Sequence, residues 1–521
     1  MVIKVLEECN ITPSRVARLR EDTLLIDLDK SEIRDVVRCL VLEKGLHFAT
    51  CVGVDYSGLS EGRLALIYIL TRPRTKLVLR VLINENEDAP RVHDILPAAE
   101  WCEYEAYDLL GFKTSLPISD RFILHWGVPS NIRPLRKDFK HDVRLCSLAS
   151  CKLVEKEGFV EVDPHHPFFY EHEDFLVKVV GNRIVDVLYV GSYINRGIEK
   201  VGESRLKMEQ VPFIAERICG ICGFTHSTAY CQAVESALNI DVPERARLER
   251  TLMLELERIE SHLLLLALVA YAVGLRDIFL ELLRYRELVM NACDVLVGNR
   301  KMYGLNIIGG VRYGFTLEQV RTVRELVEKL KDVEKVLDRL AESENVKKLK
   351  EVGVLPKDDA HKLGAVGPVA RASGIDYDVR RDLPYAAYDM VDFEVPVMDS
   401  GDTYARIVVR CEETIQSIRI IEQVLSRREL VNGEIRAEYY SNPGKIGVGM
   451  TEAPRGENVH FIITGHDSKL YRWKVRAPTY ANLAVLKRIL IGESPKNAPI
   501  IIASLDPCLS CTDRLVKVRK W

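Results

Sequence analysis

Two pairs of cysteines in this chain have the spacing CxxC and lie far apart. The first pair, Cys219 and Cys222, is in "RICGICGFTH", and the second, Cys508 and Cys511, is in "DPCLSCTDRL" near the C-terminal end. A CxxC pair is typical of a redox dithiol, of half a zinc site, or of two buried thiols without chemistry. Which of these applies depends on whether the two pairs belong to one site.

Together the two pairs provide the four thiolate ligands of a metal site. The pairs of a structural zinc site usually lie about 15 to 20 residues apart in a short segment. The much wider separation here favours a site between helices at the centre of a large fold, where distant segments converge. Soft thiolates suit nickel, iron, copper(I) and zinc. The spacing therefore favours a metal site over a redox dithiol or simple burial, and leaves the metal open.

Length and composition indicate a large protein that buries an extensive core. The 521 residues predict two or more folding units, and 47% of them are hydrophobic while 29% are charged. The net charge of −3 gives no indication of a nucleic-acid partner or an anionic membrane surface. The start, "MVIKVLEECN", lacks the apolar region of a secretory signal. Thirteen cysteines without such a signal predict a reducing compartment, where thiols serve as ligands more often than as disulfides.

The longest apolar run, from Leu263 to Leu275, has 13 residues. A helix needs about 20 apolar residues to span a bilayer, so this run predicts a buried core helix. We therefore expect any membrane association to come through partner subunits.

The pattern along the chain predicts an α+β fold in two parts. Strand-like runs at residues 63–71 and 76–83 are joined by "RPRT" as a hairpin, and Gly181-Asn182 predicts a second hairpin within residues 174–191. Long helical patterns follow Cys222. One begins near Pro243 with Asp241 as its cap, and another begins at Thr316, which forms a capping box with Gln319. The second part is thus expected to be mainly helical, with small sheets at its periphery.

The residues around the cysteines resemble a known family. "ERICGICGFTH" and "DPCLSCTDR" closely resemble the two nickel-binding signatures of NiFe hydrogenase large subunits. "TDR" in place of a final histidine resembles the membrane-bound, energy-converting branch, which includes formate hydrogenlyase and CO-linked hydrogenases and is similar to the 49-kDa subunit of complex I. The N-terminal segments "EWCEYEAYDLLGF" and "PLRKDF" resemble the 30-kDa subunit of complex I. The resemblance implies a 30-kDa-like domain at residues 1–145 and a hydrogenase large-subunit domain at residues 146–521.

The resemblance implies a binuclear nickel–iron site. Cys219 and Cys508 correspond to terminal nickel ligands, whereas Cys222 and Cys511 correspond to sulfurs that bridge nickel to iron. The family's iron also carries CO and cyanide. Because thiolate ligation shifts the pKa of a coordinated thiol, a terminal cysteine such as Cys508 can act as proton acceptor.

His226 and Arg455 are the implied polar neighbours of the metals. His226 lies four residues after Cys222 and hence on the same helical face, where the family's histidine hydrogen-bonds the bridging sulfur. Arg455, in "EAPRGE", matches the arginine that overhangs the open metal position and assists H2 heterolysis as base or as electrostatic partner. The alternative for Arg455 is a buried ion pair with Glu452 or Glu457.

The segment "VRAPTYANL" adds two residues to the implied site. Thr479 resembles a hydroxyl that hydrogen-bonds a cyanide, and Pro478 would line the same pocket. The alternative is a hydroxyl in an ordinary turn.

The resemblance also implies roles for two glutamates, Glu171 and Glu199, in segments that differ from the family pattern. Glu171, in "DPHHPFFYEHEDF", corresponds to a proton-relay glutamate whose pKa burial would raise. Asp163 and His172 replace a glycine and a proline of that loop, and neighbouring Glu173 is a competitor for the role.

Glu199, in "RGIEK", resembles a structural magnesium ligand of relatives, but Asn195 replaces a common histidine. A salt bridge on a helix surface is the alternative for Glu199.

The nine other cysteines show no spacing that indicates a site, and nothing resembles an iron–sulfur cluster motif. We expect these nine to be small buried hydrophobic residues: Cys9, Cys39, Cys51, Cys102, Cys146, Cys151, Cys231, Cys293 and Cys411. Electrons must then leave through a separate subunit. The resemblance implies a small 4Fe–4S hydrogenase subunit, a ferredoxin-like subunit, integral membrane subunits of the antiporter and complex I type, and an electron-donor module (formate dehydrogenase, CO dehydrogenase or ferredoxin).

Reversible reduction of protons to H2, at the cytoplasmic face of the membrane and coupled to ion translocation, is therefore the leading prediction. A quinone-binding or coupling subunit like that of complex I is the main alternative, but it has no need of the four cysteines. A zinc scaffold without catalysis would not require Arg455 or His226 at these offsets. The family's C-terminal processing would cut after Arg514, and we expect the short tail to be retained instead.

Overall fold

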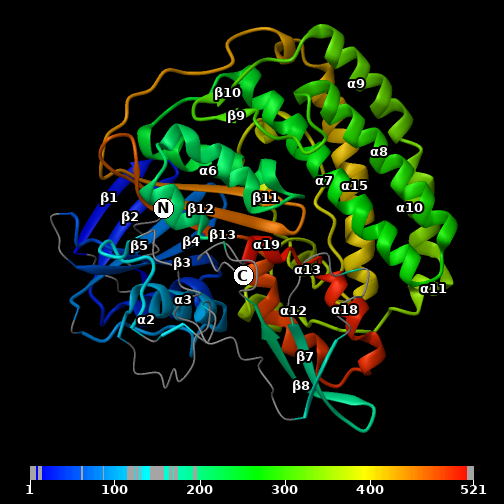
Figure 1. Cartoon of the computed structure of the whole chain (residues 1–521). Coiled ribbons are helices and arrows are strands. Elements are labelled where there is room, and N and C mark those ends of the chain that lie inside the picture. The colour runs from blue at the N-terminus through cyan, green and yellow to red at the C-terminus, as the bar shows by residue number, and fades with distance from the viewer. Residues whose placement is uncertain are drawn as a thin grey trace.

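The structure is a computed structural model that describes most of the chain. The described residues are 8–9, 14–59, 63–85, 87–113, 124, 128–129, 131–140, 158–162, 168, 174–191 and 196–512. Helices and strands are mixed, as the predicted α+β class requires. The N-terminal sheet lies to one side of a tall helical body, and the described C-terminal end lies between them near the centre of the molecule (Figure 1).

The N-terminal part is a five-stranded sheet covered by helix α3. Its strands are in the order β1-β2-β5-β4-β3. Their bounds are Arg15–Arg20 (β1), Thr23–Leu28 (β2), His47–Asp55 (β3), Leu64–Arg72 (β4) and Thr75–Ile83 (β5), followed by α3 at Glu100–Leu110. Strands β4 and β5 form the predicted antiparallel hairpin. All nine residues of β3 except the first are buried, because α3 and two strands of the central sheet, β12 (Gly456–Thr464) and β13 (Leu470–Arg476), pack against it.

The body is built around one long buried helix, α7. This helix packs against α8 and α15 along its length. The bounds are Gly223–Leu238 (α6), Glu244–Ala272 (α7), Arg276–Val297 (α8), Leu317–Leu330 (α9), Val333–Glu342 (α10) and Thr403–Ser426 (α15). The apolar run that begins at Leu263 forms the last three turns of α7, within the core that the sequence predicts. Among the described residues, no helix is long and apolar enough to cross a membrane.

Of the two predicted helix caps, that of α9 is confirmed and that of α7 is wrong. The Thr316 side chain accepts a hydrogen bond from the backbone N–H of Gln319, and the Gln319 side chain reaches back to Thr316, so the predicted capping box is confirmed. Asp241 as the cap of α7 is wrong, because Pro243 itself is the N-cap. The Asp241 carboxylate instead pairs with Arg20 at the protein surface.

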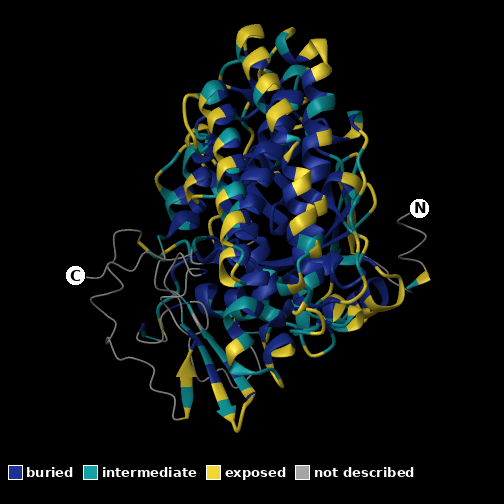
Figure 2. Cartoon of the chain, turned by 90° about the vertical axis from the view of Figure 1, so that its right-hand side faces the viewer, coloured by how far each residue is buried: buried dark blue, intermediate teal, exposed yellow. Residues whose placement is uncertain are grey.

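The prediction of peripheral sheets holds for one three-stranded sheet of the body and is wrong for the other three-stranded sheet. Strands β6 (Phe159–Glu161), β7 (Asp174–Val180) and β8 (Arg183–Val190) form a small sheet, with the predicted β7–β8 hairpin, that projects from the molecule (Figure 2). Strands β11 (Ile446–Ala453), β12 (Gly456–Thr464) and β13 (Leu470–Arg476) form a sheet at the centre, and every residue of β11 and β12 is buried.

Glycines allow helix α6 to lie directly on this central sheet. A Cβ atom on Gly447 or Gly449 of β11 would stand 1.9 Å from a backbone oxygen of α6, that of Ala233 or Ala229. Only glycine permits this close approach. As a result the middle of α6, whose N-cap is Cys222, is fixed against the sheet.

Strand β13 joins the central sheet to the N-terminal part. Arg472, Lys474 and Arg476 alternate along the strand and bond to the N-terminal part, whereas Trp473 and Val475 lie on the opposite face. Arg472 Nε donates to the Gly53 carbonyl (3.1 Å), and Lys474 forms a buried ion pair with Glu105 of α3. One strand therefore has the N-terminal part on one face and the core around the CxxC cysteines on the other.

The structure corrects the prediction for two of the nine other cysteines. Cys9 and Cys39 form a disulfide, although their separation of 30 residues gave no signal of a pair. The prediction of small buried residues is confirmed for Cys51, Cys102, Cys231, Cys293 and Cys411. Cys146 and Cys151 lie outside the described residues.

Candidate metal centre

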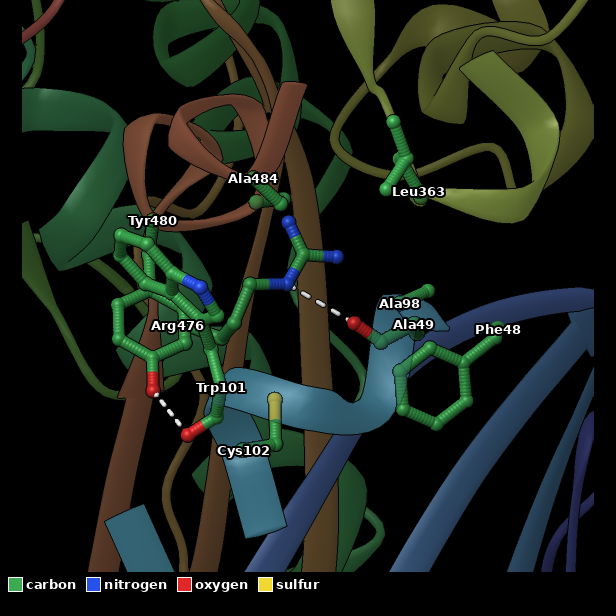
Figure 3. A pocket seen from close by; sticks show the side chains of 11 residues that line it. Phe48, Ala49, Ala98, Trp101, Cys102, Leu363, Arg476, Tyr480 and Ala484 are labelled. Atoms are coloured by element: carbon green, nitrogen blue, oxygen red, sulfur yellow. Dashed lines mark hydrogen bonds between the residues drawn. The ribbon is translucent and has the colours of Figure 1, made fainter. Parts of the chain in front are cut away.

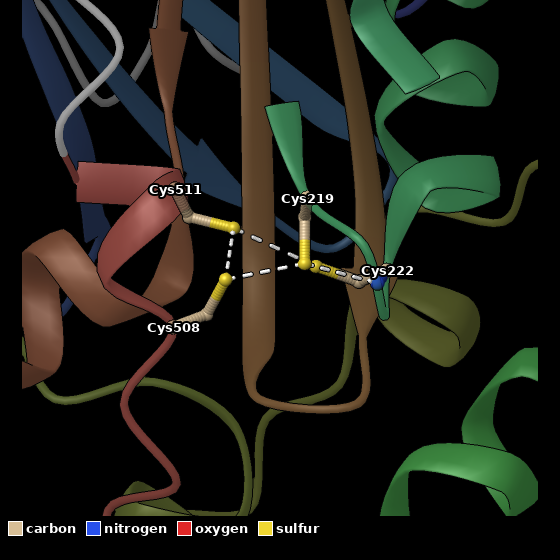
Figure 4. A group of neighbouring side chains, drawn as sticks. All are labelled: Cys219, Cys222, Cys508 and Cys511. Atoms are coloured by element: carbon tan, nitrogen blue, oxygen red, sulfur yellow. Dashed lines mark hydrogen bonds between the residues drawn. The ribbon is translucent and has the colours of Figure 1, made fainter. Parts of the chain in front are cut away.

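Two short elements and the start of α6 bring the four CxxC cysteines together. Cys219 ends the turn Glu216–Ile218, Cys222 is the N-cap of α6, and the second pair flanks the start of α19 (Leu509–Thr512). The backbone N–H groups of Ile221 and Cys222 both point at the Cys219 sulfur, at 3.2 and 3.1 Å. In Figure 4 all four sulfurs face a common centre from these two segments.

The sulfur geometry fits a thiolate-bound metal. All four Sγ atoms lie within 4.8 Å of one another and all four residues are buried. The Sγ–Sγ distances are 3.1 Å between Cys219 and Cys508, 3.7 Å between Cys222 and Cys511, and 2.9 Å between Cys508 and Cys511. Four thiolates at a metal–sulfur distance of about 2.3 Å would stand about 3.8 Å apart in a tetrahedral arrangement, so small outward movements suffice to admit a metal.

The protonation of the four thiols supports the same interpretation. Burial opposes ionisation of Cys219, but hydrogen bonds from Cys222, Cys508 and Cys511 and the charge of Arg455 outweigh it, so the pKa of Cys219 is lowered well below its usual value. Interaction with Cys219 raises the pKa values of Cys222 and Cys508, and burial, followed by the neighbouring cysteines, raises the pKa of Cys511. Four adjacent thiols cannot all ionise without a cation among them, and a bound metal supplies that cation.

His226 reaches the sulfur cluster from the first turn of α6. Its Nε2 lies 3.4 Å from Cys511 Sγ, and its Nδ1 lies 3.1 Å from Nε2 of His460 on β12. By resemblance Cys511 is one of the two bridging sulfurs, so this is the contact that the sequence predicts for His226. The second histidine, His460, was not predicted, because an isolated histidine in a strand carries no motif.

Arg455 is held against the cluster by a carboxylate that the sequence analysis missed. Its Nη2 and Nε donate to Oδ1 and the backbone carbonyl of Asp506 (2.8 and 2.7 Å), and its Nη1 donates to Ser261 Oγ (3.0 Å). The expected alternative pairing of Arg455 with Glu452 or Glu457 is absent among the described residues. The available signal was the position of Asp506, two residues before Cys508 in "DPC".

The Arg455 guanidinium stays positively charged in this setting. Burial opposes its charge, but Asp506 and the cysteines Cys222 and Cys508 outweigh burial and raise the pKa of Arg455 well above its ordinary value. Burial raises the pKa of Asp506, whose Oδ2 has no hydrogen-bond donor among the described residues. Of the two predicted roles for Arg455, the electrostatic partner is favoured over the base.

Glu452 and Glu457, the alternative partners of Arg455, belong to a separate network of buried ion pairs. Glu452 pairs with Arg371, which also binds Glu413, and Glu457 pairs with Arg476 on β13. These groups are almost fully buried. Buried charges that are mutually paired hold neighbouring elements in one arrangement, which here joins β11, β12, α13 (Gly367–Arg371) and α15.

Pro478 and Thr479 begin the short helix α16 (Pro478–Asn482) beside the second cysteine pair. Both residues are buried. The Thr479 hydroxyl accepts a hydrogen bond from the backbone N–H of Cys508 (3.0 Å). Thr479 is thus a contact of the ligand segment, and its hydroxyl hydrogen remains available to a neighbour.

Two buried carboxyls near the first cysteine pair were not predicted. Glu257 of α7 accepts hydrogen bonds from the backbone N–H groups of Phe224 (2.6 Å) and Thr225 (3.0 Å), and thereby caps α6. Burial raises the pKa of Glu257 to about 8, and it raises the pKa of Glu216, three residues before Cys219, to about 7. No motif marks Glu257, whose role depends on the helix that faces it, whereas Glu216 is the first residue of "ERICGICGFTH" and its place in that segment was the available signal.

Of the two glutamates whose segments depart from the family pattern, Glu199 lies among the described residues and Glu171 does not. Glu199 is fully buried; its carboxylate pairs with Arg472 (3.0 Å) and accepts the backbone N–H of Val475 (2.9 Å). The salt bridge of the alternative is thus present, but in the interior and not on a helix surface. Glu171 and its competitor Glu173 lie outside the described residues, as do Asp163, His172, Asn195 and Arg514.

A narrow pocket lies beside Tyr480, between the N-terminal part and the body (Figure 3). Its walls include Trp101, Leu363 and Arg476, and its volume is about 20 Å³. This is room for about one water molecule. A quinone ring does not fit it, so this pocket gives no support to the quinone-binding alternative.

Family models match most of the chain. Residues 26–144 match the 30 Kd subunit and residues 272–443 and 434–514 match the 49 Kd subunit of respiratory-chain NADH dehydrogenase, whereas residues 196–269 match nickel-dependent hydrogenase. The chain therefore belongs to the family of membrane-bound hydrogenase large subunits related to the complex I 49-kDa subunit, with a 30-kDa-like domain fused at its N-terminal side.

Individual relatives agree with this class. The chain is 36% identical over 519 residues to formate hydrogenlyase subunit 5 of Escherichia coli (strain K12), covering 96% of this chain and 91% of the relative. It is 36% identical over 391 residues to the membrane-bound hydrogenase subunit alpha of Pyrococcus furiosus, covering 71% and 90%. A chain in the structure of the membrane-bound sulfane sulfur reductase, an archaeal respiratory membrane complex, is similar with a TM-score of 0.65 and 31% identity, covering 70% of this chain and all of that one.

Proposed function

We propose that this chain is the catalytic subunit of a NiFe hydrogenase that reversibly reduces protons to H2. The observation that carries the proposal is the convergence of four buried cysteine sulfurs within the electrostatic reach of a charged, carboxylate-bound arginine. Cys219, Cys222, Cys508 and Cys511 would hold nickel and a bridged iron that carries CO and cyanide. When bound, this centre supplies the two-electron chemistry of H2.

The chain's own residues supply charge and proton sites around that centre. Arg455 presents a fixed positive charge to the sulfur cluster, which favours the separation of charge that heterolysis of H2 requires. Asp506 fixes the guanidinium and keeps one carboxylate oxygen without a donor among the described residues. A terminal sulfur, Cys508, would take up the proton, and Glu171 would pass it to solvent. The Glu199 carboxylate would bind magnesium, and it would then exchange its ion pair with Arg472 for the metal.

Electrons would arrive from a separate subunit with a 4Fe–4S cluster, followed by a ferredoxin-like subunit. The relatives named as membrane-bound support attachment through integral membrane subunits of the antiporter and complex I type. Coupling to ion translocation and an electron-donor module that uses formate, CO or ferredoxin are parts of the same proposal. The match to the complex I 49 Kd subunit is consistent with the alternative function in quinone binding or coupling. That function does not require four cysteine ligands, which this chain has.

The test is H2 evolution from reduced viologen by the purified complex. Wild-type complex and the Cys231→Ser variant should evolve H2 equally, because Cys231 is a buried thiol outside the cluster. Cys508→Ser should abolish H2 evolution and nickel binding together, because a hydroxyl is a harder and far less acidic ligand. A complex that reduces quinone and evolves no H2 would overturn the proposal.

A further inference from the structure

A line of buried hydrogen bonds leads away from the sulfur cluster to strand β13 of the central sheet. It starts at Cys511 and passes through His226 and His460 to the indole of Trp473 on β13, whose Nε1 lies 3.1 Å from His460 Nδ1. All four residues are at most 1% exposed. Water therefore does not compete for these hydrogen bonds.

The indole determines the direction of the whole line. An indole N–H can only donate a hydrogen bond, so His460 Nδ1 must be the acceptor and carries no proton. The proton of the neutral His460 ring is then on Nε2, which donates to His226 Nδ1. The His226 ring must in turn carry its proton on Nε2, and it donates that proton to the Cys511 sulfur.

We propose that Trp473 and His460 are positioning residues that make His226 a hydrogen-bond donor to Cys511. A donor on the sulfur withdraws electron density from it and so tunes any metal that the sulfur binds. Without the indole, either ring nitrogen of each histidine can carry the proton, and His226 can present a lone pair to the sulfur instead. The proposal goes beyond the proposed function and holds for any metal at the site.

The N-terminal part takes part in fixing the indole. The backbone N–H of Trp473 donates to Glu203 Oε1 (3.0 Å), and the other oxygen of Glu203 pairs with Lys137 (3.0 Å). Gly202 lies against the indole ring, where a Cβ atom would stand 2.5 Å from it. Lys137 of the N-terminal part thus helps, through Glu203, to hold a side chain that acts on the metal centre from the opposite face of β13.

The test compares Trp473→Phe with Tyr230→Phe in the purified full-length chain loaded with Co²⁺ alone. Trp473→Phe keeps an aromatic ring and removes the donor together with the five-membered ring that carries it. Tyr230 packs edge-on against Trp473, and its hydroxyl donates to the Met208 carbonyl outside the line, so its variant is a matched loss of one buried hydrogen bond. The sulfur-to-cobalt charge-transfer absorption reports electron donation by the thiolates.

Trp473→Phe should shift this band to longer wavelength, whereas Tyr230→Phe should leave it in place. A Trp473→Phe band at the wild-type wavelength, or an equal shift in Tyr230→Phe, would overturn the proposal. If Trp473→Phe does not fold, His460→Gln and His460→Leu decide: the glutamine amide accepts at one atom and donates at another and should retain the band, while leucine should shift it. Equal bands in these two would also overturn the proposal.

The loaded enzyme provides a second readout. Loss of one outer hydrogen-bond partner of a metal ligand typically costs about tenfold or more in activity. H2 turnover per nickel should therefore fall about tenfold in Trp473→Phe and stay unchanged in Tyr230→Phe. A wild-type enzyme without H2 turnover would count against the proposed function, and the cobalt comparison would still decide the role of Trp473.

Discussion

Arg455→Lys separates the geometry of the guanidinium from its charge. Arg455 uses all three nitrogens, with two hydrogen bonds to Asp506 and one to Ser261, at a site that is 1% exposed. A lysine ammonium is a single point and reaches one of these positions, so about two charge-assisted hydrogen bonds are lost. At about 1.5 to 3 kcal/mol each, the loss is about 3 to 6 kcal/mol.

Only part of this loss needs to act on the reaction to be visible. A fall of about 1.4 kcal/mol in stabilisation of the reacting state lowers the rate about tenfold. We therefore expect assembled, nickel-loaded Arg455→Lys enzyme with H2 turnover per nickel reduced by at least about tenfold. The assay combines nickel content with viologen-linked H2 evolution on the same sample.

The matched control is Arg476→Lys. Arg476 also donates from all three nitrogens, to the Ala49 carbonyl, the Glu457 carbonyl and the Glu457 carboxylate, and it faces the N-terminal sheet. Both variants should lower the melting temperature, but only Arg455→Lys should lower turnover per nickel. Near-normal turnover in Arg455→Lys, or an equal fall in Arg476→Lys, would refute the electrostatic role of Arg455.

Two further predictions concern carboxyl groups. Burial raises the pKa of Glu257 from 4.5 to about 8, so between these pH values the folded state holds a proton that the unfolded chain releases. This contribution to stability is complete below pH 4.5 and is lost as the pH rises toward 8. Between pH 5 and pH 8 the melting temperature of Glu257→Gln should therefore fall less than that of wild type, and equal falls would contradict the assignment. Glu171→Gln should keep its metals and slow H2 turnover in both directions, and the same pattern in Glu173→Gln instead would move the proton relay to that residue.

The sequence predicts the parts of the site that local spacing specifies. Both cysteine pairs, and His226 on the helical face that follows Cys222, depend on short intervals in the chain, and the structure brings these residues together. The hairpins and the Thr316 capping box are likewise local. A resemblance to known signatures added Arg455, which has no local signal of its own.

The remaining features depend on contacts between distant segments. Asp506 as the partner of Arg455, and Trp473 as the end of the histidine line, follow from how the strands of the central sheet lie beside the ligand segments. The burial of that sheet could not be read from strand patterns alone, because a short apolar strand looks the same at the edge and at the centre of a body. The Cys9–Cys39 disulfide is a contact of the same non-local kind.

Metal analysis of the purified chain tests the central claim most directly. We expect about one nickel and one iron per chain in wild type, neither in Cys508→Ser, and wild-type values in Cys231→Ser. Stoichiometric zinc in place of nickel and iron in the active complex, or nickel retained by Cys508→Ser, would contradict the account.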